Sequence, residues 1–216
     1  VNGLVGSEMC IRDSIYPKYH YGKNQSLLID ICKYELKTNK IIFLTNSMRA
    51  NYPKFSPDGK DVLFVSHENS NSQLFLMKND GSDIRQLTNF VGDIQIITPS
   101  WSPNGKSISF SKSNSDGWMD IYILDLESNE VVRVTNSKEA DFNPIWIRNS
   151  GKISFTSMYE LTPNIFTYNL NTGELIQNTD IGDIAWAIQY NKKNKSLSAI
   201  TLNTASSSKI ISVDPE

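Results

Sequence analysis

Short runs in which apolar and polar residues alternate recur along most of the chain, and turn-forming residues separate them. The segment 99–136 shows three such runs, at Ser107–Phe110, Asp120–Leu126 and Val131–Asn136. Alternation with a period of two residues is typical of β-strands, whereas an amphipathic helix repeats its apolar positions every three to four residues. The pattern therefore predicts strands joined by turns.

The same pattern returns with a period in the mid-forties. The positions Pro53, Pro99, Pro144 and Ile188 begin equivalent segments and are separated by 46, 45 and 44 residues. An apolar residue follows each of these anchor positions eleven places later: Phe64, Phe110, Phe155 and Ala199. The dipeptides that close the copies also keep register: Thr45-Asn46, Thr88-Asn89, Thr135-Asn136 and Thr179-Asp180. A period of this length that carries strands is typical of the blades of a β-propeller.

The predicted fold class is therefore all-β: an incomplete β-propeller built of four-stranded antiparallel blades. Three full blades and two partial ones would hold seventeen strands. We place these blades at 27–46 (partial), 51–89, 97–136, 142–180 and 186–213 (partial).

The first residues do not fit the repeat. Residues 1–14 match no part of it and lack the basic start, apolar run and cleavage site of a signal peptide, so we predict a non-native leader. Residues 15–26 are predicted to be an irregular lead-in or a stray strand, because Pro17 to Leu44 is too short for a full blade. We therefore expect a propeller fragment at 27–216 that belongs to a longer protein.

Two predicted hairpin turns have nearly the same sequence, Ser-Pro-Asp-Gly at 56–59 and Ser-Pro-Asn-Gly at 102–105. Proline suits the second position of a type I turn, and glycine supplies the positive φ that leads into the next strand. A glycine loop that binds phosphate would be followed by the start of a helix. Strand residues follow here, so the sequence favours turns.

Aromatic residues recur at fixed places in the repeat. Because a role present in every copy is usually structural, we predict that these residues pack between neighbouring blades, with a stacking platform for a sugar or base as the alternative. They are Phe55, Trp101, Trp146 and Tyr190, two places after the anchor, and Phe75, Tyr122 and Phe166 further on. Trp118 lies in a loop that varies between copies and is a candidate for contact with a partner.

Composition is that of an ordinary globular protein, with 39% hydrophobic and 20% charged residues. The net charge of −2 gives no electrostatic reason to expect nucleic acid, and no apolar stretch is long enough to insert into a membrane. Cys10 and Cys32 do not have the spacing of metal ligands.

Residues for catalysis are not apparent. The two histidines, His20 and His67, sit in no metal-ligand pattern, and no Gly-x-Ser-x-Gly motif offers a nucleophile. We therefore predict no metal, no cofactor and no catalytic site, and place His67 in an exposed loop. Asp80, Asp125 and Asp214 recur near strand ends, where a carboxylate accepts hydrogen bonds from turn amides.

The repeat as a whole resembles the WD40-like (PD40) repeat of TolB-type β-propellers, over about residues 27–213. The resemblance is carried by Ser-Pro-Asp-Gly-Lys at 56–60, Val-Leu-Phe-Val-Ser at 62–66, Gln73–Ser82 and Arg-Gln-Leu-Thr-Asn at 85–89. It implies a periplasmic or otherwise extracytoplasmic protein that binds a protein or peptide, with a peptidoglycan-associated lipoprotein as the partner if the chain is TolB proper. Similar repeats occur in propellers that cap the hydrolase domain of prolyl-oligopeptidase-like enzymes.

Loops between blades carry the candidate binding residues, because loops vary in length and polarity while the strands are constant. These loops are 47–52, 90–98, 137–143 and 181–187. The candidates for partner binding are Arg49, Asn51, Asp93, Asp141, Asn143 and Asp183. For Asp141 and Asn143 the alternative is a hydrogen bond to the loop backbone. The function predicted is a non-catalytic protein- or peptide-binding scaffold, and the alternative is the propeller of a serine peptidase whose hydrolase domain lies outside this sequence.

Overall fold

The computed structural model describes residues 13–68, 71–148, 150–180, 184–191, 193–203 and 206–215. Within these ranges the regular structure consists of antiparallel strands, apart from a three-residue 3-10 turn, η2 (Tyr159–Leu161). That turn is not a regular helix, since Glu160 has a φ of 50°. The prediction of an all-β fold is confirmed.

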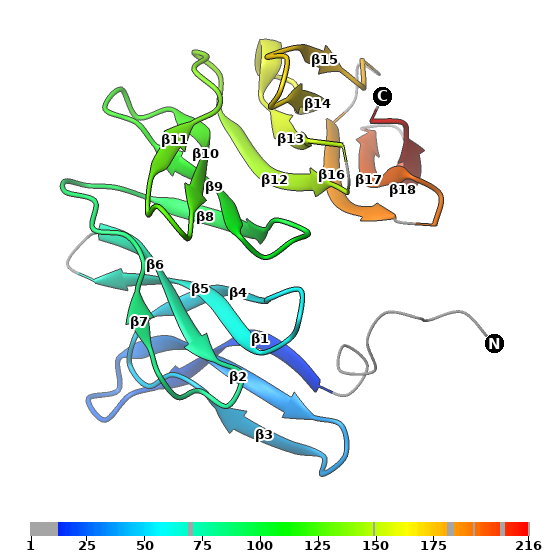
Figure 1. Cartoon of the computed structure of the whole chain (residues 1–216). Helices are drawn as coiled ribbons and strands as arrows, with labels where there is room; N and C mark the ends of the chain where they lie inside the picture. The colour runs from blue at the N-terminus through cyan, green and yellow to red at the C-terminus, as the bar shows by residue number, and fades with distance from the viewer. Residues whose placement is uncertain are drawn as a thin grey trace. The chain divides into compact units, whose positions relative to one another are not determined.

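The chain divides into two compact units, up to residue 96 and from residue 97, and each is described by itself. The first unit contains a three-stranded and a four-stranded sheet (Figure 1). Their strands, in spatial order, are β1 (Asp13–Tyr21), β2 (Leu27–Glu35) and β3 (Lys40–Phe43), then β4 (Ala50–Phe55), β5 (Asp61–Glu68), β6 (Asn71–Lys78) and β7 (Arg85–Gln86).

The second unit contains the remaining three sheets, two of four strands and one of three. The first is β8 (Ile96–Trp101), β9 (Ser107–Ser113), β10 (Met119–Asp125) and β11 (Val131–Arg133). The second is β12 (Asp141–Ile147), β13 (Lys152–Ser157), β14 (Asn164–Asn169) and β15 (Leu175–Gln177). The third is β16 (Ile184–Asn191), β17 (Ser196–Asn203) and β18 (Ser206–Val213).

Strand β1 shows that the lead-in at 15–26 is not irregular throughout: residues 15–21 form a strand, the alternative given for this segment. It pairs with β2 along its whole length, from Asp13 opposite Glu35 to Tyr21 opposite Leu27. Pro17 fits because β1 is an edge strand, where a residue without an N–H leaves no ladder partner unpaired. The described residues therefore contain eighteen strands, the seventeen expected and β1. Residues 1–12 lie outside the described ranges, and the non-native leader stays a prediction.

The two Ser-Pro-Asx-Gly turns fold alike. In the first, the Ser56 hydroxyl donates to the Asp58 carboxylate (2.7 Å) and accepts from the backbone N–H of Asp61 (3.0 Å). In the second, Ser102 bonds to Asn104 (2.7 Å) and Ser107 (2.9 Å) in the same way. Gly59 and Gly105 both have a φ of 73°, as expected from their place in the turn.

A register shift of the kind a β-bulge makes interrupts β4 and β12, the first strands of two repeats, next to the anchor position. The register shifts between Asn51 and Lys54 and between Phe142 and Ile145. Each shift contains an anchor proline, which has no N–H to give to the ladder. The residue before each of the three prolines has a positive φ: Tyr52 (54°), Thr98 (49°) and Asn143 (61°). The fourth copy keeps a register shift, between Ala187 and Gln189, although its anchor is isoleucine.

The core of each four-stranded sheet is a stacked aromatic pair on its two central strands. Phe64, Phe110 and Phe155, eleven residues after the anchors, are 0, 0 and 2% exposed. Their cross-strand partners are Phe75, Tyr122 and Phe166, at ring-centroid distances of 5.5, 6.0 and 6.2 Å. Such offset stacking adds about 0.5–1.5 kcal/mol to the burial of each pair.

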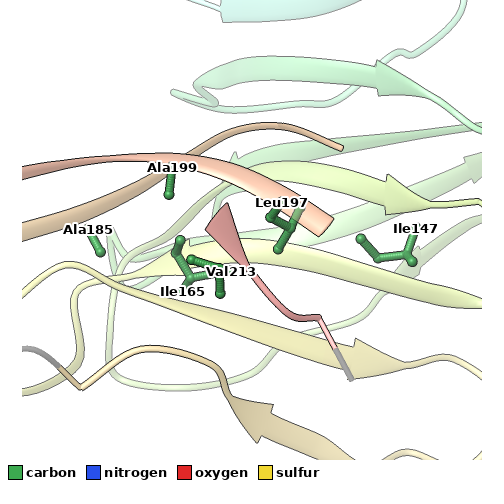
Figure 2. Packing of buried hydrophobic residues seen from close by; sticks show 6 residues of the cluster. All are labelled: Ile147, Ile165, Ala185, Leu197, Ala199 and Val213. Carbon is green, nitrogen blue, oxygen red and sulfur yellow. The ribbon is translucent and has the colours of Figure 1, made fainter. Parts of the chain in front are cut away.

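Neighbouring sheets within a unit pack face to face. In the first unit, Ile31 and Leu44 meet Phe64 and Met77 of the next sheet. In the second, Ile121 of β10 meets Phe155 and Phe166. Figure 2 shows the next such contact, where side chains of β12 and β14 meet side chains of β16, β17 and β18. The residues drawn are Ile147, Ile165, Ala185, Leu197, Ala199 and Val213.

The aromatic residues at the position two places after the anchor are half-buried. Phe55 and Tyr190 pack against the clusters between sheets, which confirms a packing role for these two. Trp146 donates its indole N–H to the carbonyl of Ser100 in the preceding sheet (3.3 Å). Trp118, by contrast, is 44% exposed. The most deeply buried aromatic side chain of each full repeat is therefore the one that lies eleven residues after the anchor.

Replacing Phe110 by alanine is expected to lower the free energy of unfolding by about 3–5 kcal/mol, because it removes a fully buried ring and leaves a cavity beside Tyr122. Urea denaturation followed by tryptophan fluorescence measures this in the second unit, since all four tryptophans lie after residue 97. Trp118→Ala, at an exposed loop position, is the matched control and should cost under about 1 kcal/mol. A similar loss for both variants would contradict this assignment of the core.

Candidate functional site

A buried threonine that follows the last strand of the sheet binds the strand beside it (β2, β6, β10 or β14) in the first four sheets. Its hydroxyl accepts a hydrogen bond from a backbone N–H of that neighbouring strand. The pairs are Thr45 with Ile31 (2.9 Å), Thr88 with Leu74 (3.0 Å), Thr135 with Ile121 (3.0 Å) and Thr179 with Ile165 (2.9 Å). We call this arrangement the threonine clip.

The hydroxyl of each clip also donates to the polar residue that precedes this N–H. The partners are Asp30 (2.7 Å), Gln73 (2.7 Å), Asp120 (3.5 Å) and Asn164 (2.9 Å). All four side chains are buried. The clip is therefore constant in geometry, while its polar partner differs from sheet to sheet.

In the first unit the polar partner also holds the following loop. Asp30 accepts hydrogen bonds from the backbone N–H groups of Ser47 (2.7 Å) and Met48 (3.1 Å), and its Oδ2 lies 2.8 Å from Nε2 of His20. Burial acts to raise the pKa of Asp30, but the hydrogen bonds from His20, Thr45 and the loop amides outweigh it and lower that pKa. Gln73 likewise bonds to both backbone groups of Phe90.

Three predicted site residues belong to this first unit. Arg49 and Asp93 are exposed loop residues, and Asn51 lies in β4, where its side-chain oxygen accepts from the N–H of Tyr52 (2.8 Å). His67 is half-buried at the end of β5 and bonds to Ser72 (2.7 Å), so its placement in an exposed loop was wrong. Burial and the charge of Arg49 lower the pKa of His67.

In the second unit a charged cluster surrounds Asp120. This carboxylate accepts hydrogen bonds from Arg133 (2.7 Å) and Asn114 (2.8 Å). Arg133 also donates from Nε to the carbonyl of Thr135 (2.9 Å). Lys112 lies 4.4 Å from the ring centroid of Tyr122 and donates to the carbonyl of Ser113. Burial lowers the pKa of Lys112, together with the charge of Arg133.

Asp141 lies inside this unit, although we expected it on an exposed loop. It is the first residue of β12, and it is 2% exposed. Ser137 donates to its Oδ2 (3.3 Å), but its buried Oδ1 has no hydrogen-bond partner. Burial raises the pKa of Asp141, and the charge of Asp120 adds to that rise against the opposing hydroxyls of Ser157, Thr135 and Ser137.

Asn143 joins two sheets through its backbone. Its N–H donates to the hydroxyl of Thr98 in the preceding sheet (3.1 Å), and that hydroxyl also lies 3.3 Å from the hydroxyl of Ser111. The structure thus brings Asp141 and Asn143 together on β12, and it groups Arg49, Asn51 and Asp93 in the other unit. Asp183 lies outside the described residues.

The chemistry available in the described ranges is hydrogen bonding and charge. No three His, Cys, Asp or Glu side chains there converge in a way that could hold a metal ion. None of the described helical residues forms a helix long and apolar enough to cross a membrane. Asp80 and Asp125 accept hydrogen bonds from turn amides, as predicted from their places at strand ends.

Sequence reasoning missed the polar network beneath the loops. The closing Thr-Asn dipeptides mark the period of the repeat, but alternation alone does not show that their threonines are buried hydrogen-bond partners. The residue just before the bonded backbone N–H is polar in each of these four repeats, and that recurrence at a buried position was the available signal: Asp30, Gln73, Asp120 and Asn164. Arg133 carried no such signal, because its role depends on a side chain thirteen residues away.

The free energy of unfolding should decrease at acid pH, because Asp30 becomes protonated there. Its folded-state pKa is lowered, so its contribution is complete above the ordinary pKa of about 4 and is lost as the pH falls through the folded value. Asp30→Asn should be less stable at neutral pH, by about 1–3 kcal/mol, because an amide cannot accept all of these hydrogen bonds. The difference from wild type should shrink between about pH 5 and pH 2. Urea denaturation followed by circular dichroism measures it, and a difference that does not change with pH would contradict the assignment.

Comparison with known proteins places these observations in a family. The profile of the family described as TolB beta propeller domain (PD40) matches residues 23–215. Curated relatives include "Tol-Pal system protein TolB" of Francisella tularensis subsp. mediasiatica, 27% identical over 72% of this chain and 35% of the relative. Another is "Uncharacterized peptidase YuxL" of Bacillus subtilis, 33% identical over 44% of this chain and 14% of the relative.

Solved structures of the same fold include TolB from Acinetobacter baumannii, with a TM-score of 0.77 and 22% identity over 92% of this chain and 49% of that one. A puromycin hydrolase has a TM-score of 0.74 at 14% identity, over 94% of this chain and 34% of that one. The chain thus spans about a third or less of the length of these curated relatives. The resemblance inferred from the repeat and the predicted propeller architecture are both confirmed. Because the family profile matches nearly all of the sequence, the chain belongs to the TolB beta propeller domain family.

Proposed function

We propose that this chain is a binding module that recognises a protein or peptide through the loops next to its threonine clips. The observation that carries the proposal is the contrast between clip and loop. The clip hydroxyl sits in the same hydrogen bonds in four sheets, and Asp30 and Gln73 extend it to the backbone of the adjoining loop. The loops themselves differ in length and in exposed side chains. A rigid frame that presents variable loops is how a scaffold makes specific contacts.

Arg49, Asp93 and Trp118 are the exposed loop residues proposed to make these contacts. Arginine and tryptophan are the residue types that most often dominate the binding energy of protein interfaces. Asn51 and Asn143 are half-buried, and in the proposal they shape the loop backbone. Asp183 stays in the proposal on the strength of its place in the sequence alone.

The relatives support one partner as the first to test. One of them bears the name "Tol-Pal system protein TolB", so a peptidoglycan-associated lipoprotein is the partner that we propose to test first. An extracytoplasmic, periplasmic location is part of the same proposal.

The test is binding of this chain to a peptidoglycan-associated lipoprotein that lacks its lipid, measured by isothermal titration calorimetry. Trp118→Ala and Arg49→Ala should each weaken binding about tenfold, because a truncated interface anchor typically costs 1–2 kcal/mol. Glu127→Ala is the control, since Glu127 is exposed in the turn between β10 and β11, at the other end of the strands from Trp118. Equal affinity for all variants would exclude the loops as the contact surface, and no binding would exclude this partner.

A second function has its own support, the 33% identity to a peptidase over 97 residues. In that case the propeller would belong to a serine peptidase and would restrict which substrates reach a separate hydrolase domain. The reading frame that continues past residue 216 distinguishes the two functions, because the peptidase requires a Gly-x-Ser-x-Gly nucleophile motif there. Hydrolysis of an aminoacyl-naphthylamide by the full-length protein would support the peptidase and contradict the binding module.

A further inference from the structure

Asp141 departs from the repeat at a position that is otherwise apolar. The equivalent residues, three places before the other anchors, are Ala50, Ile96 and Ala185, and all three are fully buried. Asp141 is as buried as they are. A carboxylate has therefore entered a site that in the other copies holds only hydrocarbon, and one of its oxygens has no hydrogen-bond partner. A buried polar group without a partner is rare in folded proteins and calls for a physical explanation.

The threonine clip next to Asp141 is the weakest of the four. The hydroxyl of Thr135 lies 3.5 Å from Asp120, whereas the other three clips close at 2.7, 2.7 and 2.9 Å. The carboxyl group of Asp141 lies near the same hydroxyl and near the carboxylate of Asp120, and the charge of Asp120 helps to raise the pKa of Asp141. Two buried carboxyl groups close to one another are unfavourable when both are ionised.

The charged groups on the surrounding strands do not compensate Asp141. On β11, Arg133 donates to Asp120. On β9, Lys112 donates to the carbonyl of Ser113 and lies over Tyr122. On β10, Asp120 has the same sign as Asp141, and neither Ser157 of β13 nor any residue of β16 carries a charge. An ionised Asp141 would therefore be a buried charge without a counter-ion, which is strongly unfavourable.

Protonation of Asp141 removes the unpaired buried charge, and it requires fewer ligands than the binding of a metal ion would. Calcium takes six to eight oxygen ligands, commonly from several carboxylates, and no such grouping exists in the described residues. A protonated carboxyl group needs no counter-ion and can donate to a neighbouring hydroxyl. We propose that Asp141 is a proton-binding site whose carboxyl group stays neutral in the folded chain and fastens the segment 137–140 to β12, so that its ionisation at higher pH loosens that segment.

The protonation state of Asp141 would also affect the binding of a partner. Segment 137–140 joins β11 to β12 beside the Thr135 clip, on the loops that we propose to bind a partner. Loosening it would weaken binding as the pH rises. That consequence rests on the proposed function, whereas the effect of Asp141 on stability does not.

The test compares wild type with Asp141→Asn, which cannot ionise, and with Asp141→Ala, which restores the residue found at positions 50 and 185. Urea denaturation from pH 4 to pH 9, followed by tryptophan fluorescence, reports the second unit. The folded state holds a proton that the unfolded state loses above the ordinary pKa of about 4. The unfolding constant of wild type should therefore rise relative to both variants, by up to tenfold per pH unit, until the folded-state pKa is passed.

Two results would overturn the proposal. If the three proteins show parallel pH profiles, Asp141 does not hold a proton. If calcium chloride stabilises wild type but not Asp141→Asn, with choline chloride as the control for ionic strength, the site holds a metal ion instead. Asp30→Asn, in the first unit and therefore followed by circular dichroism, is the control for a buried aspartate with a lowered pKa, and its pH dependence should have the opposite sign. Because no partner is present, failure here leaves the proposed function to its own test.

Discussion

A buried threonine hydroxyl is the interaction on which the rest of this structure depends. The last strand of each four-stranded sheet is only two or three residues long, so the β-ladder ends early. The third strand then continues past it with a buried backbone N–H that must find another acceptor, since an unpaired buried amide costs about 1–3 kcal/mol. The threonine that follows the short strand supplies that acceptor. A short outer strand is therefore compatible with a closed hydrogen-bond network.

Because the hydroxyl must in turn donate its own proton, each clip requires a polar residue just before the backbone N–H that the threonine binds. Aspartate, glutamine and asparagine all satisfy this requirement, and each brings different neighbours with it. Asp30 orders a loop through two amides, whereas Asp120 binds Arg133 and Asn114. The constraint thus fixes the position of a polar group while leaving its charge free to vary. The loop residues can therefore differ between copies of the repeat while the hydrogen bonds that close the sheets are kept.

The sequence predicts the strands well because alternation and period are local signals that repeat. Sequence patterns do not predict features that depend on which strands pair with one another. Pro17 resembles an anchor proline, yet β1 takes the place beside β2 that β5 takes beside β6, and only the register shows this. The sequence shows that the residue eleven places after each anchor is apolar. That this residue forms the centre of the sheet's core depends on its stacking with an aromatic ring of the next strand. Asp141 looked like a loop residue because strand ends cannot be placed to within a residue from sequence.

The repeat also supplies an internal reference that a single-copy fold lacks. Three equivalent positions show that an alanine or isoleucine fits where Asp141 stands, so the carboxyl group is not required by the fold. Local departures of this kind, in which a residue breaks a rule that its equivalents obey, are expected at functional or strained places and not in a packed core chosen for stability alone. The long hydrogen bond of the Thr135 clip, in the neighbouring sheet β8–β11, lies beside this departure. A departure that is confined to one of four equivalent positions, next to an inter-blade loop, indicates a role that belongs to that loop and not to the scaffold.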